Sequence, residues 1–277
     1  MPRALLLLPL SLTLALIGGP GRVDAQDLIP RPDTDPSLVL DEARNLARAG
    51  RYEEALQRQI WFRDHALRKG VGMGGVRQSF ALSDWLELGK KYPPAHQALV
   101  DRRDKDRAAC LGEGGTSQDF SDVASINGYL DEDDGTIALF RQLDAEKPRL
   151  ARASIHYAKT KLVEAGEYRL CAKYVPDPEW DFRAIRTGYE GIMKNKELVQ
   201  RDPSIGRAME KSFSNQTCEL IEILVGAGRK PEAEAIRTRA LDVRDDPQIR
   251  EAIATAAARV AQRALPASSP EPPRQKP

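Results

Sequence analysis

The side chains best suited to acid–base or metal chemistry are the three histidines, His65, His96 and His156. A zinc-protease helix carries two histidines four residues apart with a glutamate beside the first, and these three are too widely spaced for that. The Gly-x-Ser-x-Gly turn that presents a nucleophilic serine is also missing from the sequence. Carboxylates occur along the whole chain, and no pair of them stands out. We therefore predict a protein that is not an enzyme, with no catalytic residue, no metal and no cofactor.

Three cysteines, Cys110, Cys171 and Cys218, are the other reactive side chains. Their spacing matches no metal-ligand pattern. An odd count leaves at least one thiol free or paired between molecules. Cys171 falls on the small-residue position of a repeated pattern, where we expect it to be buried as a small hydrophobe. A Cys110–Cys218 bridge is left open, because only their separation in the fold can decide it.

Aromatic and basic residues concentrate between residues 61 and 92. Aromatic side chains anchor many binding surfaces, but at helical spacing they also build cores. The basic residues could meet an acidic partner or simply be solvated. From this stretch we predict a candidate partner-binding surface made of Trp61, Arg77, Trp85, Lys90, Lys91 and Tyr92.

The elements that position these side chains are indicated by a repeated pattern. A leucine, an Ala-Gly pair and a small residue recur at the same offsets three times. Glycine accepts the positive φ that often ends a helix, and a small residue lets the next helix cross closely, so each copy predicts a helical hairpin. The copies are Leu46, Ala49, Gly50 and Ala55; Leu162, Ala165, Gly166 and Cys171; and Leu224, Ala227, Gly228 and Ala233.

The rest of the chain also predicts helices. Apolar residues recur at helical spacing and no segment sustains a two-residue alternation, so we expect an all-α fold of antiparallel hairpins. Ser37 can cap the first helix. An aspartate followed by proline is a further helix-start signal. It occurs at Asp177-Pro178, Asp202-Pro203 and Asp246-Pro247.

Glycines predict the breaks between hairpins. The stretch 71–75, Val-Gly-Met-Gly-Gly, lacks the Gly-Lys-Ser/Thr ending of a phosphate-binding loop, so we expect a connector. Gly89, followed by Tyr92 and Ala95, predicts another hairpin turn. The distance from Gly166 to Gly228 is too long for one repeat, so we expect an extra helix between them.

The N-terminal segment has the composition of an export signal. Arg3, an apolar run over 4–17 and small residues up to Ala25 predict a signal peptide over 1–25. The run is shorter than the roughly 20 apolar residues that span a bilayer, and no later segment is apolar enough to span one. We therefore expect a periplasmic or extracellular protein that has no membrane span after cleavage of the signal.

The remaining boundaries follow from proline content. A leader rich in Pro and Asp over 26–36 should be extended. The helical domain is predicted over 37–265, and a disordered Pro-rich tail over 266–277. The formal net charge is only +1, and charges of both signs alternate over 101–107, so their fields cancel. We therefore predict no nucleic-acid partner.

The run from Arg48 to Leu56, with its Ala-Gly pair, Tyr52 and Ala55, resembles the tetratricopeptide repeat (TPR) family. The turns at Gly166 and Gly228 share part of the motif. The resemblance implies an α-solenoid whose concave face receives an extended or helical peptide. With the signal peptide, it leads us to expect an exported, bacterial-type scaffold for protein or peptide binding.

Two other functions stay open at this point. One is an exported all-α enzyme with an unrecognised carboxylate or histidine site. The other is an envelope component whose function is assembly with itself. Neither the partner nor the oligomeric state can be read from the residues.

Overall fold

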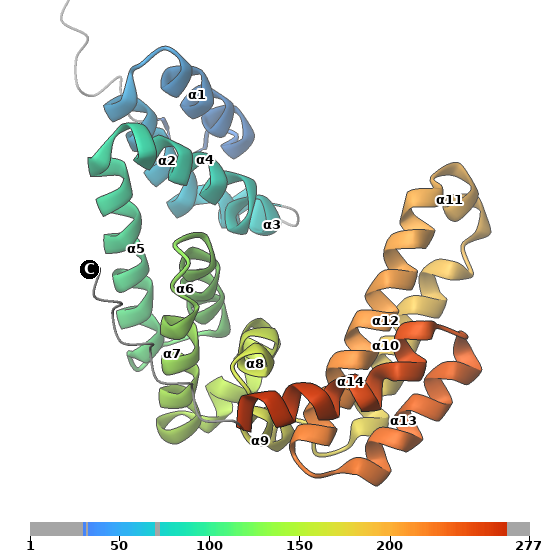
Figure 1. Cartoon of the computed structure of the whole chain (residues 1–277). Helices are drawn as coiled ribbons and strands as arrows, with labels where there is room; N and C mark the ends of the chain where they lie inside the picture. Colours follow the sequence, from blue (N-terminus) through green and yellow to red (C-terminus); the bar gives the residue numbers. More distant parts are fainter. Residues whose placement is uncertain (1–29, 32, 70–72, 265–277) are drawn as a thin grey trace, which may run out of the picture. The chain divides into compact units, whose positions relative to one another are not determined.

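The computed structural model describes residues 30–31, 33–69 and 73–264. The predicted signal peptide (1–25) and tail (266–277) lie outside the described residues, as do residues 26–29 and 32 of the predicted leader. Within the described ranges every regular element is a helix, which confirms the all-α prediction (Figure 1).

The helices are short to medium in length and packed in consecutive pairs. Their bounds are α1 Pro36–Arg48, α2 Tyr52–His65, the 3-10 helix η2 Ala66–Lys69, α3 Met73–Gln78, α4 Phe80–Lys91, α5 Pro93–Leu111, α6 Ser117–Tyr129, α7 Asp133–Glu146, α8 Pro148–Glu164, α9 Tyr168–Lys173, α10 Pro178–Met193, α11 Lys196–Arg201, α12 Pro203–Gly226, α13 Lys230–Val243 and α14 Pro247–Ala264.

The chain forms two compact units, an N-terminal unit over Met1–His96 and a C-terminal unit over Gln97–Pro277. In the N-terminal unit α1 packs along α2, and α4 packs against both. In the C-terminal unit α7 pairs with α8, while α12 lies along α10, α13 and α14 (Figure 1). One extra helix is expected between Gly166 and Gly228, whereas the structure has two, α10 and α11, between α9 and α12.

The three predicted turns are confirmed. Gly50, Gly166 and Gly228 have φ values of +77°, +79° and +81°. In each turn the leucine of the pattern is buried and its carbonyl accepts the backbone N–H five residues on, which is the bond that closes a Schellman motif. These bonds join Leu46 to Arg51 (3.0 Å), Leu162 to Glu167 (2.8 Å) and Leu224 to Arg229 (2.7 Å).

A fourth copy of this turn joins α6 to α7. The acidic run from Asp131 to Asp134 predicts a turn between two helices here, although the leucine and the Ala-Gly pair of the other copies are absent. Asp131 takes the glycine position with φ +57°, and the N–H of Glu132 donates to the carbonyl of Asn127 at 2.9 Å. Thr136 occupies the small-residue position and accepts a hydrogen bond from Nδ2 of Asn127 at 3.0 Å. A buried polar pair thus replaces the leucine and the small residue of the other copies.

The Asp-Pro pairs begin helices as predicted. The Asp177 carboxylate accepts the N–H groups of Glu179 and Trp180 at the start of α10, and Asp202 and Asp246 cap α12 and α14 in the same way. The prediction that Ser37 caps the first helix is wrong. Asp35 caps α1 instead, because its carboxylate accepts the N–H of Ser37 at 2.9 Å.

Two glycine predictions in the N-terminal unit are also wrong. Gly74 and Gly75 lie in the first turn of α3 rather than in a connector. Gly89 does not end its helix, since α4 continues to Lys91. A Cβ atom at Gly89 would lie 3.1 Å from the backbone nitrogen of His96, so this glycine allows the start of α5 to pack closely.

Candidate functional site

Three of the six residues predicted to form a partner surface are buried in the N-terminal unit. Trp61, Arg77 and Trp85 are only 5%, 3% and 2% exposed. The Trp61 ring stacks on His65, and Trp85 Nε1–H donates to the carbonyl of Ala95 at 2.8 Å. These three side chains therefore build the unit's interior and offer no surface to a partner.

The other three predicted residues are at least partly accessible. Lys90 pairs with Glu87 at 2.5 Å, and Tyr92 is half-buried near Tyr52. Lys91 is exposed at the edge of a cavity of about 280 Å³ between α1 and α4. Partner binding by these three residues stays a prediction.

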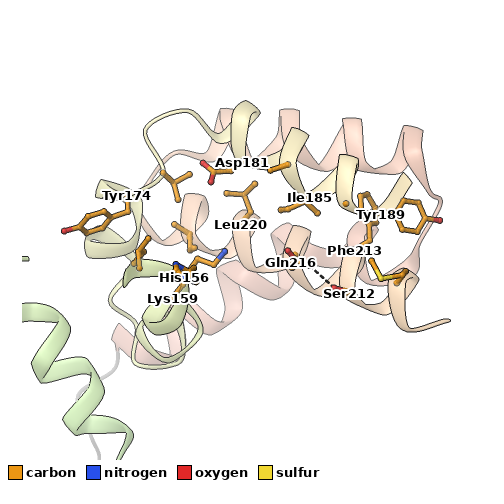
Figure 2. Close-up of a pocket in the computed structure, with 16 residues that line it drawn as sticks. His156, Lys159, Tyr174, Asp181, Ile185, Tyr189, Ser212, Phe213, Gln216 and Leu220 are labelled. Carbon is orange, nitrogen blue, oxygen red and sulfur yellow. Dashed lines mark hydrogen bonds between the residues drawn. The ribbon is translucent and has the colours of Figure 1, made fainter. Parts of the chain in front are cut away.

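A larger groove of about 320 Å³ lies in the C-terminal unit, between α8, the end of α9, α10 and α12 (Figure 2). Tyr174 lies at one end of this groove, and Tyr189 with Phe213 at the other (Figure 2). Its lining residues are Ile155, His156, Lys159, Tyr174, Val175, Asp181, Ala184, Ile185, Gly188, Tyr189, Met209, Ser212, Phe213, Gln216, Leu220 and Ile223.

The helical repeat explains how the sequence builds this groove. On α10 the lining residues recur every three or four positions, from Asp181 through Ile185 to Tyr189, which places them along one face. On α12, which packs along α10, Leu220, Gln216 and Phe213 follow the same spacing. Two facing stripes thus form the long walls of the groove, which continues onto α8.

The apolar part of the groove is supported by aromatic side chains that pack beneath its surface. Phe213 is fully buried, and its ring lies 4.8 Å from that of Tyr189 and 6.3 Å from that of Phe182. Ile185 and Tyr189 are half-buried, so each keeps apolar surface in contact with water. A Cβ atom at Gly188 would meet nothing within 4 Å, so the wall is open at this point.

The polar part of the groove centres on Asp181. Burial raises the pKa of its carboxyl above the usual range; Lys159 opposes the shift, Asp177 adds to it, and Arg229 opposes it. Lys159 is itself paired with Glu219 at 3.0 Å. No hydrogen bond or ion pair from the described residues reaches the Asp181 carboxylate.

The charged or basic side chains that line the groove are His156, Lys159 and Asp181. His156 is exposed and its ring lies beside that of Tyr157. Asp181 is the only carboxylate among the lining residues. In the part of the chain that the structure describes, no three His, Cys, Asp or Glu side chains gather as a metal site would require. The apolar and charged side chains of the lining suit contact with a ligand that is itself partly apolar and partly charged.

The sequence leaves open whether Cys110 and Cys218 form a disulfide. In the structure all three thiols are free. A Cys110–Cys218 bridge is therefore not present. Cys171 is fully buried, as expected for the small-residue position. Burial raises the pKa of Cys110 to about 11, of Cys171 to about 12 and of Cys218 to about 11, so the thiols are poor nucleophiles.

Comparison with protein-family models, with curated proteins and with solved structures finds no match for this chain. No family is therefore assigned to this all-helical protein. A search of the described helices finds none with the length and apolar character needed to cross a membrane.

The partner surface predicted from the sequence lies in the N-terminal unit, whereas this groove lies in the C-terminal unit. The apolar stripe of α10, with Phe182, Ile185 and Tyr189, is visible in the sequence as an ordinary amphipathic helix. Only the structure distinguishes α10 from an ordinary amphipathic helix. Pro178 and Phe182 are the only buried residues of α10, so the rest of its apolar stripe stays partly exposed. No residue type marks Asp181 as the carboxylate that is left without a partner.

Proposed function

We propose that this chain is a scaffold that binds a segment of another protein in the groove between α8, α10 and α12, with no catalysis of its own. The observation that carries the proposal is the half-buried apolar stripe along that groove, from Ile185 to Tyr189. Concave, mostly apolar surfaces with a few polar groups are where proteins bind ligands.

The dimensions of the groove fit a short stretch of chain. Asp181 and Tyr189 are separated by two helical turns, or about 12 Å at 1.5 Å per residue. An extended segment rises about 3.3 Å per residue, so about four of its residues would cover this distance. One or two large apolar side chains could bury against Ile185, Tyr189 and Met209, which are half-buried.

The hairpin turns support the wider proposal of a TPR-like solenoid. Four turns of one geometry, at Gly50, Asp131, Gly166 and Gly228, join consecutive antiparallel helices. Stacked helical pairs of this kind usually serve as binding surfaces. We extend the proposal to export, on the basis of the signal-like composition of 1–25.

The test is a selection with a random dodecapeptide phage library on the purified full chain and on two variants. Gly188→Leu would fill the groove, whereas Gly191→Leu alters the same helix outside the groove lining. A Cβ atom at either glycine meets nothing within 4 Å, and leucine favours a helix over glycine, so both variants should fold.

We expect the wild-type chain and Gly191→Leu to enrich the same peptides, rich in large apolar residues, and Gly188→Leu to enrich none of them. Thermal melts show that both variants are folded. Selection of the same peptides by Gly188→Leu, or no enrichment on the wild-type chain, would overturn the proposal.

A further inference from the structure

We infer that the groove selects a lysine or arginine of the bound segment, which pairs with Asp181. This inference rests on the proposed function and names the chemistry that the binding segment must have. The other lining residues allow apolar contact with many sequences, whereas a carboxylate in a half-buried position discriminates strongly by charge.

Asp181 is the only carboxylate among the lining residues, and it forms no ion pair with the cations near the groove. Lys159 is the one lysine or arginine among the lining residues, but it pairs with Glu219 at 3.0 Å, and Glu219 also accepts a hydrogen bond from the hydroxyl of Thr160 at 2.7 Å. Arg229, at the start of α13, pairs with Glu232 and donates to the carbonyl of Val175. Both cations thus form their ion pairs with other carboxylates and act on Asp181 only by longer-range attraction.

The remaining charged groups that face Asp181 leave the net charge around it negative. Asp177, one helical turn before it, is a second carboxylate, and it is occupied in capping α10. His156, across the groove on α8, is exposed to water. A cationic side chain therefore meets a net negative site, and it would supply the partner that the Asp181 carboxylate lacks.

The position of Asp181 also predicts how far the basic residue of the bound segment lies from its large apolar residue. It lies at one end of the apolar stripe, while Tyr189 and Phe213 lie at the other (Figure 2). Because that distance of about 12 Å matches about four residues of extended chain, the lysine or arginine should lie three to five positions from a large apolar residue.

The test repeats the peptide selection on Asp181→Asn and on Asp242→Asn. Asparagine keeps the shape of the side chain and removes the charge. Asp242, on α13, is exposed and outside the groove lining, so its variant loses the same net charge elsewhere. A peptide chosen by the wild-type chain is then measured against each variant by fluorescence anisotropy.

We expect the wild-type chain and Asp242→Asn to enrich peptides in which a basic residue precedes or follows an apolar one at this spacing. Asp181→Asn should keep the apolar preference, lose the basic one, and bind the wild-type peptide about tenfold more weakly, since a charge-assisted hydrogen bond is lost.

The two proposals fail in different ways. Apolar peptides without basic residues on the wild-type chain, or an unchanged basic preference in Asp181→Asn, would overturn this inference and leave the groove as a binding site. If the wild-type chain enriches nothing, the proposed function itself is wrong.

Discussion

Asp131 holds a backbone conformation that costs free energy for any residue except glycine. Its φ of +57° is the left-handed region in which the Cβ atom crowds the following carbonyl. We predict that Asp131→Gly stabilises the protein by about 0.5–1 kcal/mol, and that Gly50→Ala destabilises it by about 1 kcal/mol. Urea unfolding of both variants measures these changes. A stability gain from Gly50→Ala would contradict the role given to the positive φ.

Asp181 gives a pH-dependent prediction that needs no ligand. Because burial raises the pKa of this carboxyl, the folded state holds the proton more tightly than the unfolded state. Its contribution to stability is therefore present at acidic pH and is lost as the pH rises through the folded-state pKa. Asp181→Asn should raise the Tm at neutral pH, and the gain should shrink on acidification. A constant gain across pH would argue against a half-buried carboxylate that lacks an ion-pair partner.

At the scale of elements, the C-terminal helix α14 is held to the hairpin α8–α9 and to α12 through one buried carboxylate. Glu222 of α12, 4% exposed, accepts hydrogen bonds from the Tyr168 hydroxyl at 3.0 Å and from Arg259 at 2.6 Å. Arg263 donates to Glu222 and to the carbonyl of Val163. Three helical elements thus share one network of charge-assisted hydrogen bonds.

This junction requires a glycine on α12. A Cβ atom at Gly226 would lie 2.2 Å from Cγ of Tyr168, well inside contact distance. We predict that Gly226→Ala destabilises the protein by about 1–3 kcal/mol through overpacking. Gly188→Ala is the matched control in open space, where alanine should stabilise the helix by about 0.5–1 kcal/mol. Equal effects of the two changes in urea unfolding would exclude the close contact.

Local requirements explain which elements could be predicted from the sequence. Gly50, Gly166 and Gly228 mark turns because a positive φ strongly favours glycine, and Asp-Pro pairs mark helix starts because both residues suit those positions. The acidic run 131–134 predicts the fourth turn, but not its left-handed geometry, because aspartate at position 131 indicates a positive φ less clearly than glycine does. The end of α4 is missed because Gly89 serves close packing rather than a turn.

Tertiary packing explains why the candidate site could not be predicted. Trp61 and Trp85 have the helical spacing of both a core and a binding surface, and only the packing of α2 and α4 decides between them. The same holds for Ile185 and Tyr189, whose spacing resembles that of any amphipathic helix. Whether such a stripe stays open depends on what the rest of the chain places over it.

For the whole molecule, stability rests on packing and hydrogen bonds without a covalent cross-link. Cys110, Cys171 and Cys218 are free and their pKa values are raised. We predict that a reducing agent leaves the Tm unchanged. An Ellman titration should show no fast-reacting thiol in the native protein and three after denaturation. A fall in Tm on reduction would reveal a disulfide and contradict this arrangement.

The most direct test of the groove as the binding site is a calorimetric titration of one library-selected peptide into three proteins. The wild-type chain and Gly191→Leu should bind with the same Kd within about twofold, and Gly188→Leu at least about tenfold more weakly, a difference of about 1.4 kcal/mol. Equal binding by Gly188→Leu and the wild-type chain, with both folded, would contradict the claim that α8, α10 and α12 form the binding site.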